Sequence, residues 1–344
     1  AYLTKEISPE NHVITANEGG AVAMAIGHHL VSQAIPAIYL QNSGLGNAIN
    51  PLLSLASNEV YGIPMILFVG WRGHDNEKDE PQHVHQGRIM PEMIRSMGFP
   101  SLELAKDAGT VKRQINEALN FAKEQASPFF VFVRKGTFEE AVGLPEVSDL
   151  KVSREAAIIA AIETISDMDL VVATTGMISR EVFEYRKEKD TGHHRDFLTV
   201  GGMGHASQIA LGIANARPDR QVFCFDGDGA ALMHMGGMAL VGQSSCSNLV
   251  HIIFNNGVHA SVGGQKTVGF EIDFCKIAEG CGYGSTAKVN AIDKLVEALE
   301  LQNNSDSPRF VEVHVRPENK EGIGRPDQPP SQNKFDFIDF VSRR

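Results

Sequence analysis

The sequence predicts an α/β protein built from two Rossmann-like domains, each a parallel sheet covered by helices. Short apolar runs typical of buried strands alternate with helix-compatible segments through most of the 344 residues, a length sufficient for two ordinary domains. The alternation stops around residues 137–151, a loose stretch typical of a linker, and then starts again. We therefore expect one domain over residues 1–146 and another over residues 147–344.

The composition limits the classes of function. Hydrophobic residues make up 42% and charged residues 21% of the chain, as in folded rather than disordered proteins. The net charge of −11 argues against a nucleic-acid partner. No apolar run approaches the roughly 18 residues of a membrane span, the start does not resemble a signal peptide, and the four cysteines form no CxxC. We expect a cytoplasmic protein with free thiols that acts on a small molecule, without a membrane partner.

The first domain is expected to contain short apolar strands and amphipathic or Ala-rich helices. Its expected strands are residues 12–16, 35–40, 64–69 and 128–134. Its expected helices are residues 21–30, 47–56 and 111–124. The polar residues 71–88 show neither the hydrophobic period of a helix nor that of a strand, which predicts a loop.

The second domain repeats the same style of alternation. Its expected strands are residues 169–174, 197–200, 222–225, 249–254 and 309–315. Its expected helices are residues 154–165, 179–188, 205–216, 230–238, 274–281, 292–301 and 335–341. Pro, Gly and charged residues over 318–333 predict a loop before the last helix.

Two polar motifs follow apolar strands of the second domain. Gly227-Asp228-Gly229 follows one strand, and Asn255-Asn256-Gly257 follows the next. The segment between them has the length of a helical crossover, so both motifs should lie at the carboxyl ends of parallel strands, where α/β sheets bind ligands. A carboxylate, an amide oxygen and a helix N-terminus together favour a Mg²⁺-diphosphate site. The alternative is that Gly-Asp-Gly is only a turn.

This pairing of motifs resembles the cofactor-binding motif shared by thiamine diphosphate-dependent decarboxylases, carboligases and transketolases. The resemblance implies thiamine diphosphate and Mg²⁺ as cofactors. It implies that the metal is held by Asp228, the Asn256 side chain and the Val258 carbonyl. The neighbouring residues implied to line the cofactor are Gly227, Gly229 and Ala230.

The same family needs a glutamate in its other domain, and Glu18 is the candidate. It follows an expected strand and opens a small-residue helix, and residues 17–21, Asn-Glu-Gly-Gly-Ala, resemble the family's activating segment. The implied catalytic role is a hydrogen bond to the aminopyrimidine N1′. The alternative is a solvated acid in the first turn of a helix, where the helix dipole favours it.

A glycine-rich loop in the second domain also resembles the family. Met203 is implied to wedge between the two cofactor rings, with the Gly201 carbonyl facing the 4′-amino group and Gly204 and His205 in the same binding loop. The alternative is a core methionine beside a tight turn.

A third candidate segment for cofactor binding follows the first strand of the second domain. Thr175, Gly176 and Ser179 lie at the start of an expected helix and are candidate donors to the diphosphate. Ser179 could instead cap that helix.

The polar residues 71–88 concentrate cations and histidines after a strand of the first domain. Arginine forks there would suit phosphonate or carboxylate oxygens. The expected substrate-binding residues are Asn42, Ser43, Arg72, Lys78, His83 and Arg88. The alternatives are a solvated surface loop or a histidine metal site, and the second lacks acidic or Cys partners at ligand spacing.

This segment, with residues 41–47, 204–208 and 261–265, is similar to the phosphonopyruvate decarboxylase family. The resemblance implies decarboxylation of 3-phosphonopyruvate to phosphonoacetaldehyde and CO₂ in phosphonate biosynthesis, by a homodimer or larger assembly with the active site between chains. The family carries a further segment before the equivalent of Asn11, so we expect the first domain to lack it.

Alternatives to this reaction stay open. They are the decarboxylation of sulfopyruvate or another anionic 2-oxo acid, a non-catalytic thiamine diphosphate-binding subunit, and a carboligase.

Overall fold

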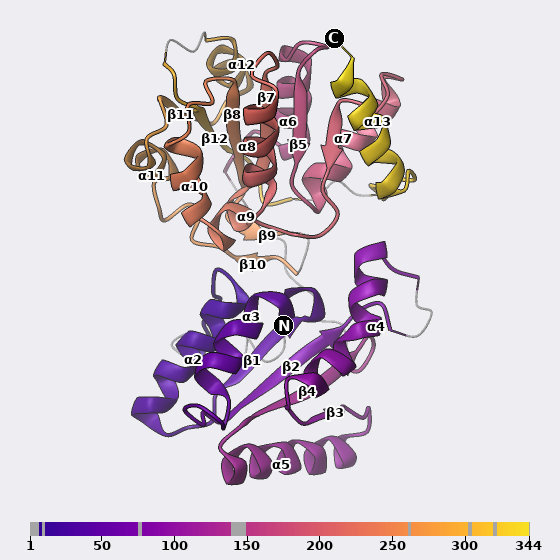
Figure 1. Ribbon diagram of the computed structural model, residues 1–344, viewed down its shortest axis with the longest axis vertical. Coiled ribbons are helices and arrows are strands. Elements are labelled where there is room, and N and C mark those ends of the chain that lie inside the picture. The colour runs from indigo at the N-terminus through magenta and orange to yellow at the C-terminus, as the bar shows by residue number, and fades with distance from the viewer. Residues whose placement is uncertain are drawn as a thin grey trace. The chain divides into compact units, whose positions relative to one another are not determined.

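The chain forms two compact units, Ala1–Leu144 and Pro145–Arg344 (Figure 1). The structure is a computed structural model, and it describes residues 7–8, 11–74, 78–138, 149–260, 263–301, 305–318 and 322–343. The expected domain boundary after residue 146 lies within residues 139–148, outside the described residues.

The first unit is a four-stranded parallel sheet covered on both faces by helices. Its strands are β1 (Ala37–Gln41), β2 (Met65–Trp71), β3 (Ser101–Glu103) and β4 (Pro128–Arg134). Its helices are α2 (Glu18–Ser32), the 3-10 helix η2 (Asn42–Gly44), α3 (Leu45–Pro51), the π-helix η3 (Leu52–Ala56), α4 (Pro81–Ser96) and α5 (Ala108–Gln125). The strand order is β1-β2-β4-β3.

The central strands of this sheet are buried between two layers of helices. β2 and β4 are buried along most of their length, and such continuous apolar runs are typical of parallel strands covered on both sides. One face packs against α2, α3, η3 and α4, and the other packs against α5. The expected parallel α/β architecture is thus confirmed for this unit.

Two expectations for the first unit are wrong. Residues 12–16 form no strand, because apolar and β-branched residues supply no hydrogen-bond partner by themselves; Val13 stays 57% exposed. Residues 71–88 are not all loop, since α4 begins at Pro81, a residue whose fixed φ suits the first helical turn. The buried face of α4 begins with His83 and Gly87, which are not apolar enough to reveal the helical period.

The second unit contains a six-stranded parallel sheet and a short antiparallel pair. Its strands are β5 (Leu170–Ala173), β6 (Asp196–Leu198), β7 (Val222–Gly227), β8 (Leu249–Asn255), β9 (Val258–His259), β10 (Gln265–Lys266), β11 (Ser285–Val289) and β12 (Arg309–His314). Its helices are α6 (Arg154–Thr164), α7 (Met177–Glu188), α8 (Ala206–Ala216), α9 (Asp228–Met233), α10 (Gly236–Gly242), α11 (Phe274–Cys281), α12 (Ile292–Glu300) and α13 (Pro330–Ser342).

The order of the large sheet is β11-β12-β8-β7-β5-β6, so β7 and β8 are central neighbours. Helices α6, α7 and α12 cover one face, and α8, α10, α11 and α13 cover the other. This arrangement confirms the expected second parallel α/β unit. It also brings the segments after β7 and β8 to one edge of the sheet, as Figure 1 shows around α9 and β9.

Three details of the second unit differ from expectation. The helix expected at 230–238 is two helices, because the chain leaves helical geometry at His234 and α10 restarts at Gly236. β11 was missed because it is an edge strand with no buried residue. The β9–β10 pair was missed because each strand is only two residues long.

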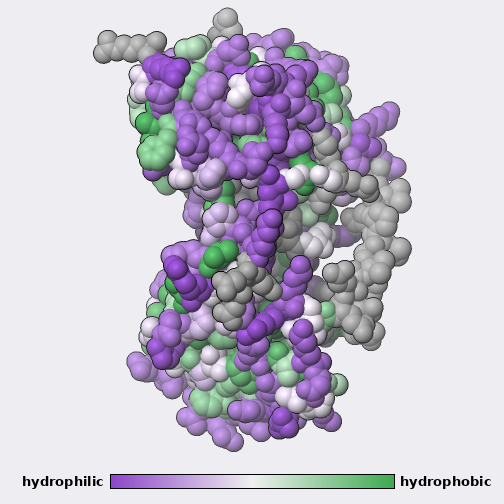
Figure 2. All heavy atoms as spheres, turned by 90° about the vertical axis from the view of Figure 1, so that its right-hand side faces the viewer, coloured by the Kyte–Doolittle hydropathy of each residue, from purple (hydrophilic) through white to green (hydrophobic). Residues whose placement is uncertain are grey.

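The face drawn in Figure 2 is mainly hydrophilic, with hydrophobic side chains scattered over it. Among the described residues, no helix combines the length and apolarity needed to cross a membrane.

Candidate active site

Asp228 is a buried acid at the candidate site of the second unit. It follows β7 as the first residue of α9, and only 2% of its surface is exposed. The Thr267 hydroxyl donates to Oδ2, and the Asn256 N–H donates to Oδ1 at 3.3 Å. Gly269 closes over the carboxylate, because a Cβ there would lie 2.6 Å from Oδ2.

The electrostatics of Asp228 suit a cation. Burial raises the pKa of this carboxyl group, and the hydrogen bonds from Thr267 and Asn256 offset only part of that effect. These two donors are neutral, so the charged form is favoured only weakly. A divalent cation would supply the missing compensation.

The two asparagines after β8 have different tasks. Asn255 is fully buried, and its Nδ2 donates to the Gly269 carbonyl at 2.7 Å and to Glu312 Oε1 at 2.8 Å. Asn256 lies beside Asp228, and its Oδ1 accepts from the Val258 N–H at 3.2 Å. Asn255 therefore holds the turn, while Asn256 contacts Asp228 through its backbone N–H and carries a side-chain oxygen beside it.

The oxygen donors at this turn fit Mg²⁺, which prefers carboxylate and amide oxygens and leaves positions for phosphates. The structure brings the predicted ligands Asp228 and Asn256 together. The Val258 carbonyl accepts a hydrogen bond from the Ala260 N–H at 3.0 Å. Sequence reasoning missed Thr267 and Gly269, which lie beyond the short β9–β10 pair and carry no recognisable motif.

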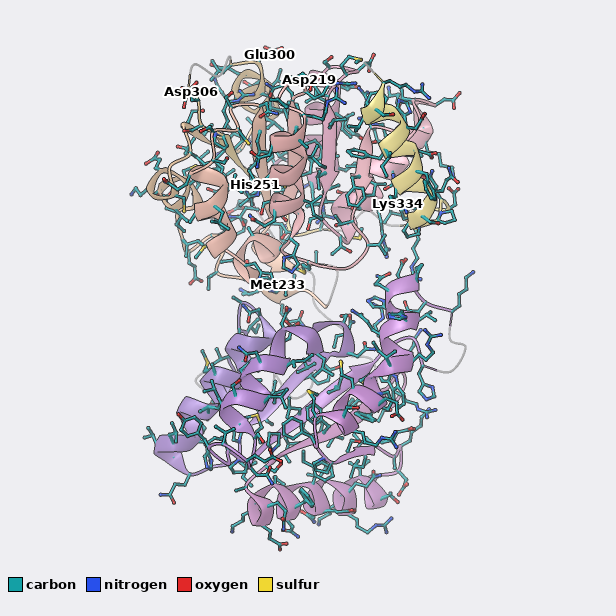
Figure 3. All side chains as sticks on the ribbon, viewed as in Figure 1. Asp219, Met233, His251, Glu300, Asp306 and Lys334 are labelled. Carbon is teal, nitrogen blue, oxygen red and sulfur yellow. The ribbon has the colours of Figure 1, made fainter. Side chains whose placement is uncertain are left out.

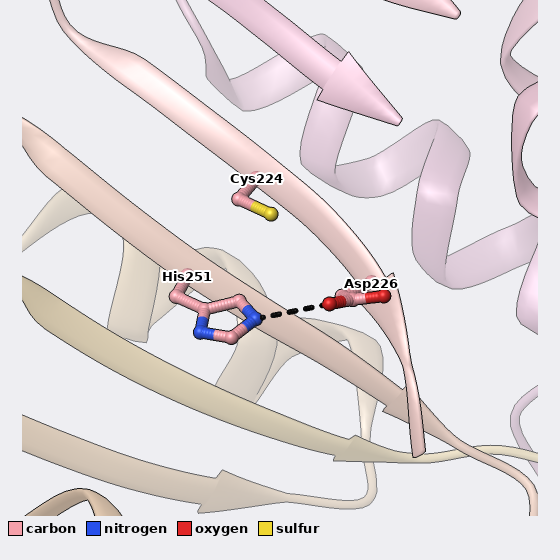
Figure 4. Close-up of side chains that lie close together, drawn as sticks. All are labelled: Cys224, Asp226 and His251. Atoms are coloured by element: carbon pink, nitrogen blue, oxygen red, sulfur yellow. Dashed lines mark ion pairs between the residues drawn. The ribbon is translucent and has the colours of Figure 1, made fainter. Parts of the chain in front are cut away.

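A buried polar cluster links β7 to β8 just before the Gly-Asp-Gly turn (Figure 4). His251 Nε2 lies 3.5 Å from Asp226 Oδ2, and His251 Nδ1 shares a hydrogen bond with the Tyr283 hydroxyl at 3.0 Å. Asp226 Oδ1 accepts from the Gly227 N–H at 3.0 Å. Burial raises the pKa of the adjacent Cys224 thiol, which keeps it neutral. The cluster thus fixes the backbone that leads into Asp228.

The glycine-rich loop packs against the start of α9. Gly201 and Gly204 have φ values of 75° and 89°, which favour glycine, and the Gly201 N–H donates to Thr175 Oγ1 at 3.0 Å. Met203 is half-buried, and its Cε would lie 3.5 Å from a Cβ on Gly229. The structure therefore gathers Thr175, Gly201, Met203, Gly204 and Gly229 in one place.

The remaining cofactor candidates lie around this loop. Ser179 is buried, and its hydroxyl donates to the carbonyls of Ala173 and Thr174 at 3.1 and 2.7 Å. It therefore does not cap α7; the capping position is Gly176, with φ of 100°. Gly227 ends β7, and Ala230 is buried in α9. His205 is exposed immediately before α8.

Glu18 in the first unit occupies a specific niche. Its Oε2 accepts from Asn47 Nδ2 at 2.8 Å. Gly44 makes room for the carboxylate, because any Cβ at that position would collide with Oε1. Asn17 caps α2 by accepting from the Gly20 N–H at 2.8 Å. The Glu18 carboxylate is therefore held in one orientation, unlike a solvated acid in the first turn of a helix. Gly44 and Asn47 lie within the motif at 41–47, although the sequence does not show their role.

Two of the predicted substrate residues make hydrogen bonds beside strand ends, and Asn42 joins the end of β1 to the end of β2. Asn42 is buried, and its side chain bonds both the Arg72 carbonyl at 2.8 Å and the Arg72 N–H at 3.4 Å. The Ser43 hydroxyl donates to Gln41 Oε1 at 2.6 Å. All three hydrogen bonds are internal to the first unit.

Arg72 and His83 are also internally paired. The Arg72 guanidinium donates from Nε to Asp79 at 2.9 Å and from a terminal nitrogen at 2.5 Å, and His83 Nδ1 lies 3.2 Å from the same carboxylate. Burial alone would raise the pKa of Asp79, but these contacts and the Glu80 N–H hold it at about 2. Burial lowers the pKa of His83, which favours the neutral ring. The Arg72 fork is thus occupied by Asp79.

Lys78 and Arg88 differ from the other substrate candidates because both are exposed. An Arg88 terminal nitrogen lies 3.3 Å from His85 Nδ1 on the preceding turn of α4. Of the predicted substrate residues, these two present a cation at the described surface of the first unit without an acidic partner at hydrogen-bonding distance.

Comparisons with known proteins agree with this geometry. The family model described as "Thiamine pyrophosphate enzyme, N-terminal TPP binding domain" matches residues 3–93, and "Thiamine pyrophosphate enzyme, C-terminal TPP binding domain" matches residues 174–313. The first match includes Glu18, and the second includes Asp228 and Asn256.

Full-length relatives are also found. A phosphonopyruvate decarboxylase of Streptomyces viridochromogenes is 33% identical over 99% of this chain and 89% of its own length. One from Streptomyces hygroscopicus is 31% identical over 99% and 88%. A sulfopyruvate decarboxylase of Methanosarcina acetivorans is 28% identical over 96% and 88%. This chain therefore belongs to the thiamine pyrophosphate enzyme family and is a thiamine diphosphate-dependent decarboxylase.

Proposed function

We propose that this decarboxylase converts 3-phosphonopyruvate to phosphonoacetaldehyde and CO₂, a step of phosphonate biosynthesis. The observation that carries the proposal is the 33% and 31% identity to two phosphonopyruvate decarboxylases over 99% of the chain. The sulfopyruvate decarboxylase is less similar, at 28% over 96%. Sulfopyruvate is the second candidate because its sulfonate resembles a phosphonate in shape and charge.

In this proposal Asp228, Asn256 and Val258 hold Mg²⁺, and the metal binds the cofactor diphosphate. The support is the buried, neutrally compensated Asp228 carboxylate beside the Asn256 amide. When bound, thiamine diphosphate supplies a thiazolium ring that accepts the electrons released by decarboxylation. The loop of Gly201 and Met203 would shape the space for the cofactor rings.

Glu18 would act as the catalytic acid-base partner of the aminopyrimidine. Its carboxylate already accepts one hydrogen bond from Asn47, which leaves its other oxygen for the N1′ atom. The niche at Gly44 fixes the direction of that oxygen. A fixed carboxylate loses little entropy on engagement, which favours proton movement at N1′.

The substrate's negative charges need local compensation because the chain is acidic. Lys78 and Arg88 are the exposed cations that would meet them on the first unit. Asn42, Ser43, Arg72 and His83 would contribute by holding this surface in place through their internal bonds.

We further propose that the protein works as a homodimer or larger assembly with the active site between chains. The first unit supports this with exposed apolar side chains, among them Leu30, Val31 and Tyr39 at 67%, 88% and 69% exposure. Light scattering across a range of protein concentrations tests the assembly, and a monomer that turns over at full rate contradicts it.

The function is tested by turnover of phosphonopyruvate with and without thiamine diphosphate and Mg²⁺. We expect CO₂ release that needs both, and a higher kcat/KM for phosphonopyruvate than for sulfopyruvate. The reverse preference would make sulfopyruvate the substrate. Acyloin formation from an added aldehyde would indicate a carboligase, and cofactor binding without turnover would indicate a non-catalytic subunit.

A further inference from the structure

Glu312 is a carboxylate buried within the large sheet of the second unit. It lies in β12, between β11 and β8, and none of its surface is exposed. Figure 1 shows the three strands side by side, and Figure 3 labels His251 in β8. Removing a carboxylate from water costs free energy unless partners compensate its charge. The partners of Glu312 therefore show what its burial achieves.

Three side chains surround the Glu312 carboxylate. Its Oε1 accepts from Asn255 Nδ2 at 2.8 Å and lies 2.8 Å from His314 Nε2. Lys288, which pairs with Glu312 across β11 and β12, places its Nζ 3.4 Å from Oε2. Burial alone would raise the pKa of Glu312, but these contacts lower it. The carboxylate is therefore ionised, and its hydrogen bond to Asn255 is charge-assisted.

Asn255 connects Glu312 to the two turns beside Asp228. Its Nδ2 also donates to the Gly269 carbonyl at 2.7 Å, and its Oδ1 accepts from the Gly257 N–H at 3.1 Å. The Gly269 N–H donates to Thr267 Oγ1 at 3.1 Å, and the Thr267 hydroxyl donates to Asp228. One amide side chain thus holds both the turn after β8 and the turn after β10.

His314 provides a second connection from Glu312 to the turn after β8. Its ring packs against Phe270, with ring centroids 5.0 Å apart. Phe270 lies over Gly257, because a Cβ there would be 2.5 Å from Cδ2 of the phenyl ring. Gly257 has a φ of 69°, which favours glycine. Both connections therefore end at the residue between Asn256 and Val258.

We propose that Glu312 is a positioning residue for the metal site, an inference that rests on the proposed Mg²⁺ ligands. Asn256 and Val258 flank Gly257, so a shift of the Asn255 amide would move their oxygens relative to Asp228. Mg²⁺ demands nearly ideal octahedral geometry, so small displacements of its ligands weaken binding. Glu312 acts through Asn255 and is not itself a ligand.

The test is calorimetry of thiamine diphosphate binding at a series of Mg²⁺ concentrations. Glu312→Ala removes the acceptor for Asn255 Nδ2 and should raise the Mg²⁺ concentration for half-maximal binding by about ten- to a hundredfold. Glu312→Gln keeps an oxygen for this bond but loses the charge, so the rise should be about three- to tenfold. At saturating Mg²⁺ and cofactor, kcat for decarboxylation should stay within about threefold of the wild-type value, because Glu312 acts only through the metal site.

Asp196 is the matched control for burial and charge. It is also 0% exposed, and it accepts two hydrogen bonds from Arg186 at 2.9 and 3.0 Å. It lies in β6, at the opposite edge of the sheet from β11. Asp196→Asn should lower the Tm of the apoprotein and leave the Mg²⁺ requirement within about twofold of the wild-type value. An equal rise in Asp196→Asn and Glu312→Gln would assign the effect to lost stability and overturn the inference.

Two further outcomes would overturn it. One is a Mg²⁺ requirement of Glu312→Gln within about twofold of the wild-type value, a result that decides the question even if Glu312→Ala does not fold. The other is a loss of kcat that saturating Mg²⁺ and cofactor do not restore. Equal binding of thiamine diphosphate by the wild-type protein with and without Mg²⁺ would instead overturn the proposed metal site.

Discussion

Two buried carboxylates, Asp79 in the first unit and Asp228 in the second, show opposite solutions to the same problem. Asp79 receives two hydrogen bonds from the Arg72 guanidinium, and its pKa is held at about 2. Asp228 receives its hydrogen bonds from a hydroxyl and a backbone N–H, and burial raises its pKa. Asp228 is also the more buried residue, because it is 2% exposed while Asp79 is only half-buried, so the two differ both in burial and in the charge of their donors.

The difference teaches how to distinguish a structural charge from a functional one in this protein. A carboxylate with an internal cation is already compensated and stabilises the fold. A carboxylate compensated only by neutral donors costs free energy until a cation arrives from outside. By this criterion Arg72 belongs to the structure of the first unit, while Asp228 is suited to a metal.

The largest expected effect separates these carboxylates directly. Asp228→Asn should weaken thiamine diphosphate binding in Mg²⁺ buffer by about a hundredfold or more, because the metal loses its charged ligand. The Tm of the apoprotein should stay equal or rise. The reason is that burial raises the folded pKa of Asp228 above its unfolded value. The group therefore favours folding when it is protonated at low pH, and its charged form opposes folding near pH 7.

Calorimetry measures the affinity for thiamine diphosphate in Mg²⁺ buffer. Thermal melts without cofactor measure the Tm of the apoprotein. Asp228→Asn with normal cofactor binding would remove Asp228 from the metal site. A clear fall in apoprotein Tm would mean that its hydrogen bonds outweigh the burial cost.

The second prediction concerns Glu18, whose partners are neutral like those of Asp228. Glu18→Gln keeps the shape of the side chain but removes the negative charge, so kcat should fall by about a hundredfold or more, on the order of 3 kcal/mol in the barrier. The dissociation constant of the cofactor should change little. Glu155, a first-turn acid of α6 in the other unit, is the matched control, and Glu155→Gln should leave kcat unchanged. Near-normal activity of Glu18→Gln would remove it from the mechanism.

The third prediction distinguishes Arg88 from Arg72. Arg88→Met keeps much of the apolar stem, and kcat/KM on phosphonopyruvate should fall by about ten- to a hundredfold, with a smaller loss on pyruvate. Arg72→Met should reduce both activities together and lower Tm, because its fork holds Asp79. The control is Arg95→Met, which removes another exposed arginine of α4 that pairs with Glu92. If Arg88→Met behaves like this control, Arg88 does not bind the phosphonate.

The smallest expected effect is the acid dependence of the Asp79 pair. The folded pKa of Asp79, about 2, lies below its ordinary value of 3.8, so its stabilisation is present above that ordinary value and is lost as pH falls toward 2. Asp79→Asn should lower the free energy of unfolding by about 1–2 kcal/mol at pH 7, a value reduced for solvent screening because the Arg72 side chain is 34% exposed.

Urea titrations of the wild type and Asp79→Asn between pH 7 and pH 3 test this pH dependence. The difference in their free energies of unfolding should be constant down to about pH 5 and then shrink. A difference that stays the same at pH 3 would show that hydrogen-bond geometry, and not charge, stabilises the pair.

The sequence was most informative where function depends on residues close together along the chain. Gly-Asp-Gly and Asn-Asn-Gly were recognisable because they follow apolar runs, and parallel strands carry such segments to one edge of a sheet. The Glu18 segment was recognisable by its short motif alone. Prediction failed where structure depended on partners distant in the chain. Residues 12–16 had the apolar and β-branched residues typical of a strand but no described pairing, and α4 was hidden because its buried face begins with His83 and Gly87.

The sequence by itself therefore determined the two α/β units, the family and the candidate cofactor residues, because strand period and short motifs are local properties. Only the tertiary structure decided which charges are free to act. Arg72 looked like an anion clamp until its fork was found on Asp79, seven residues away. Compensation of charge depends on distances in space, and residue types and spacing alone do not specify those distances.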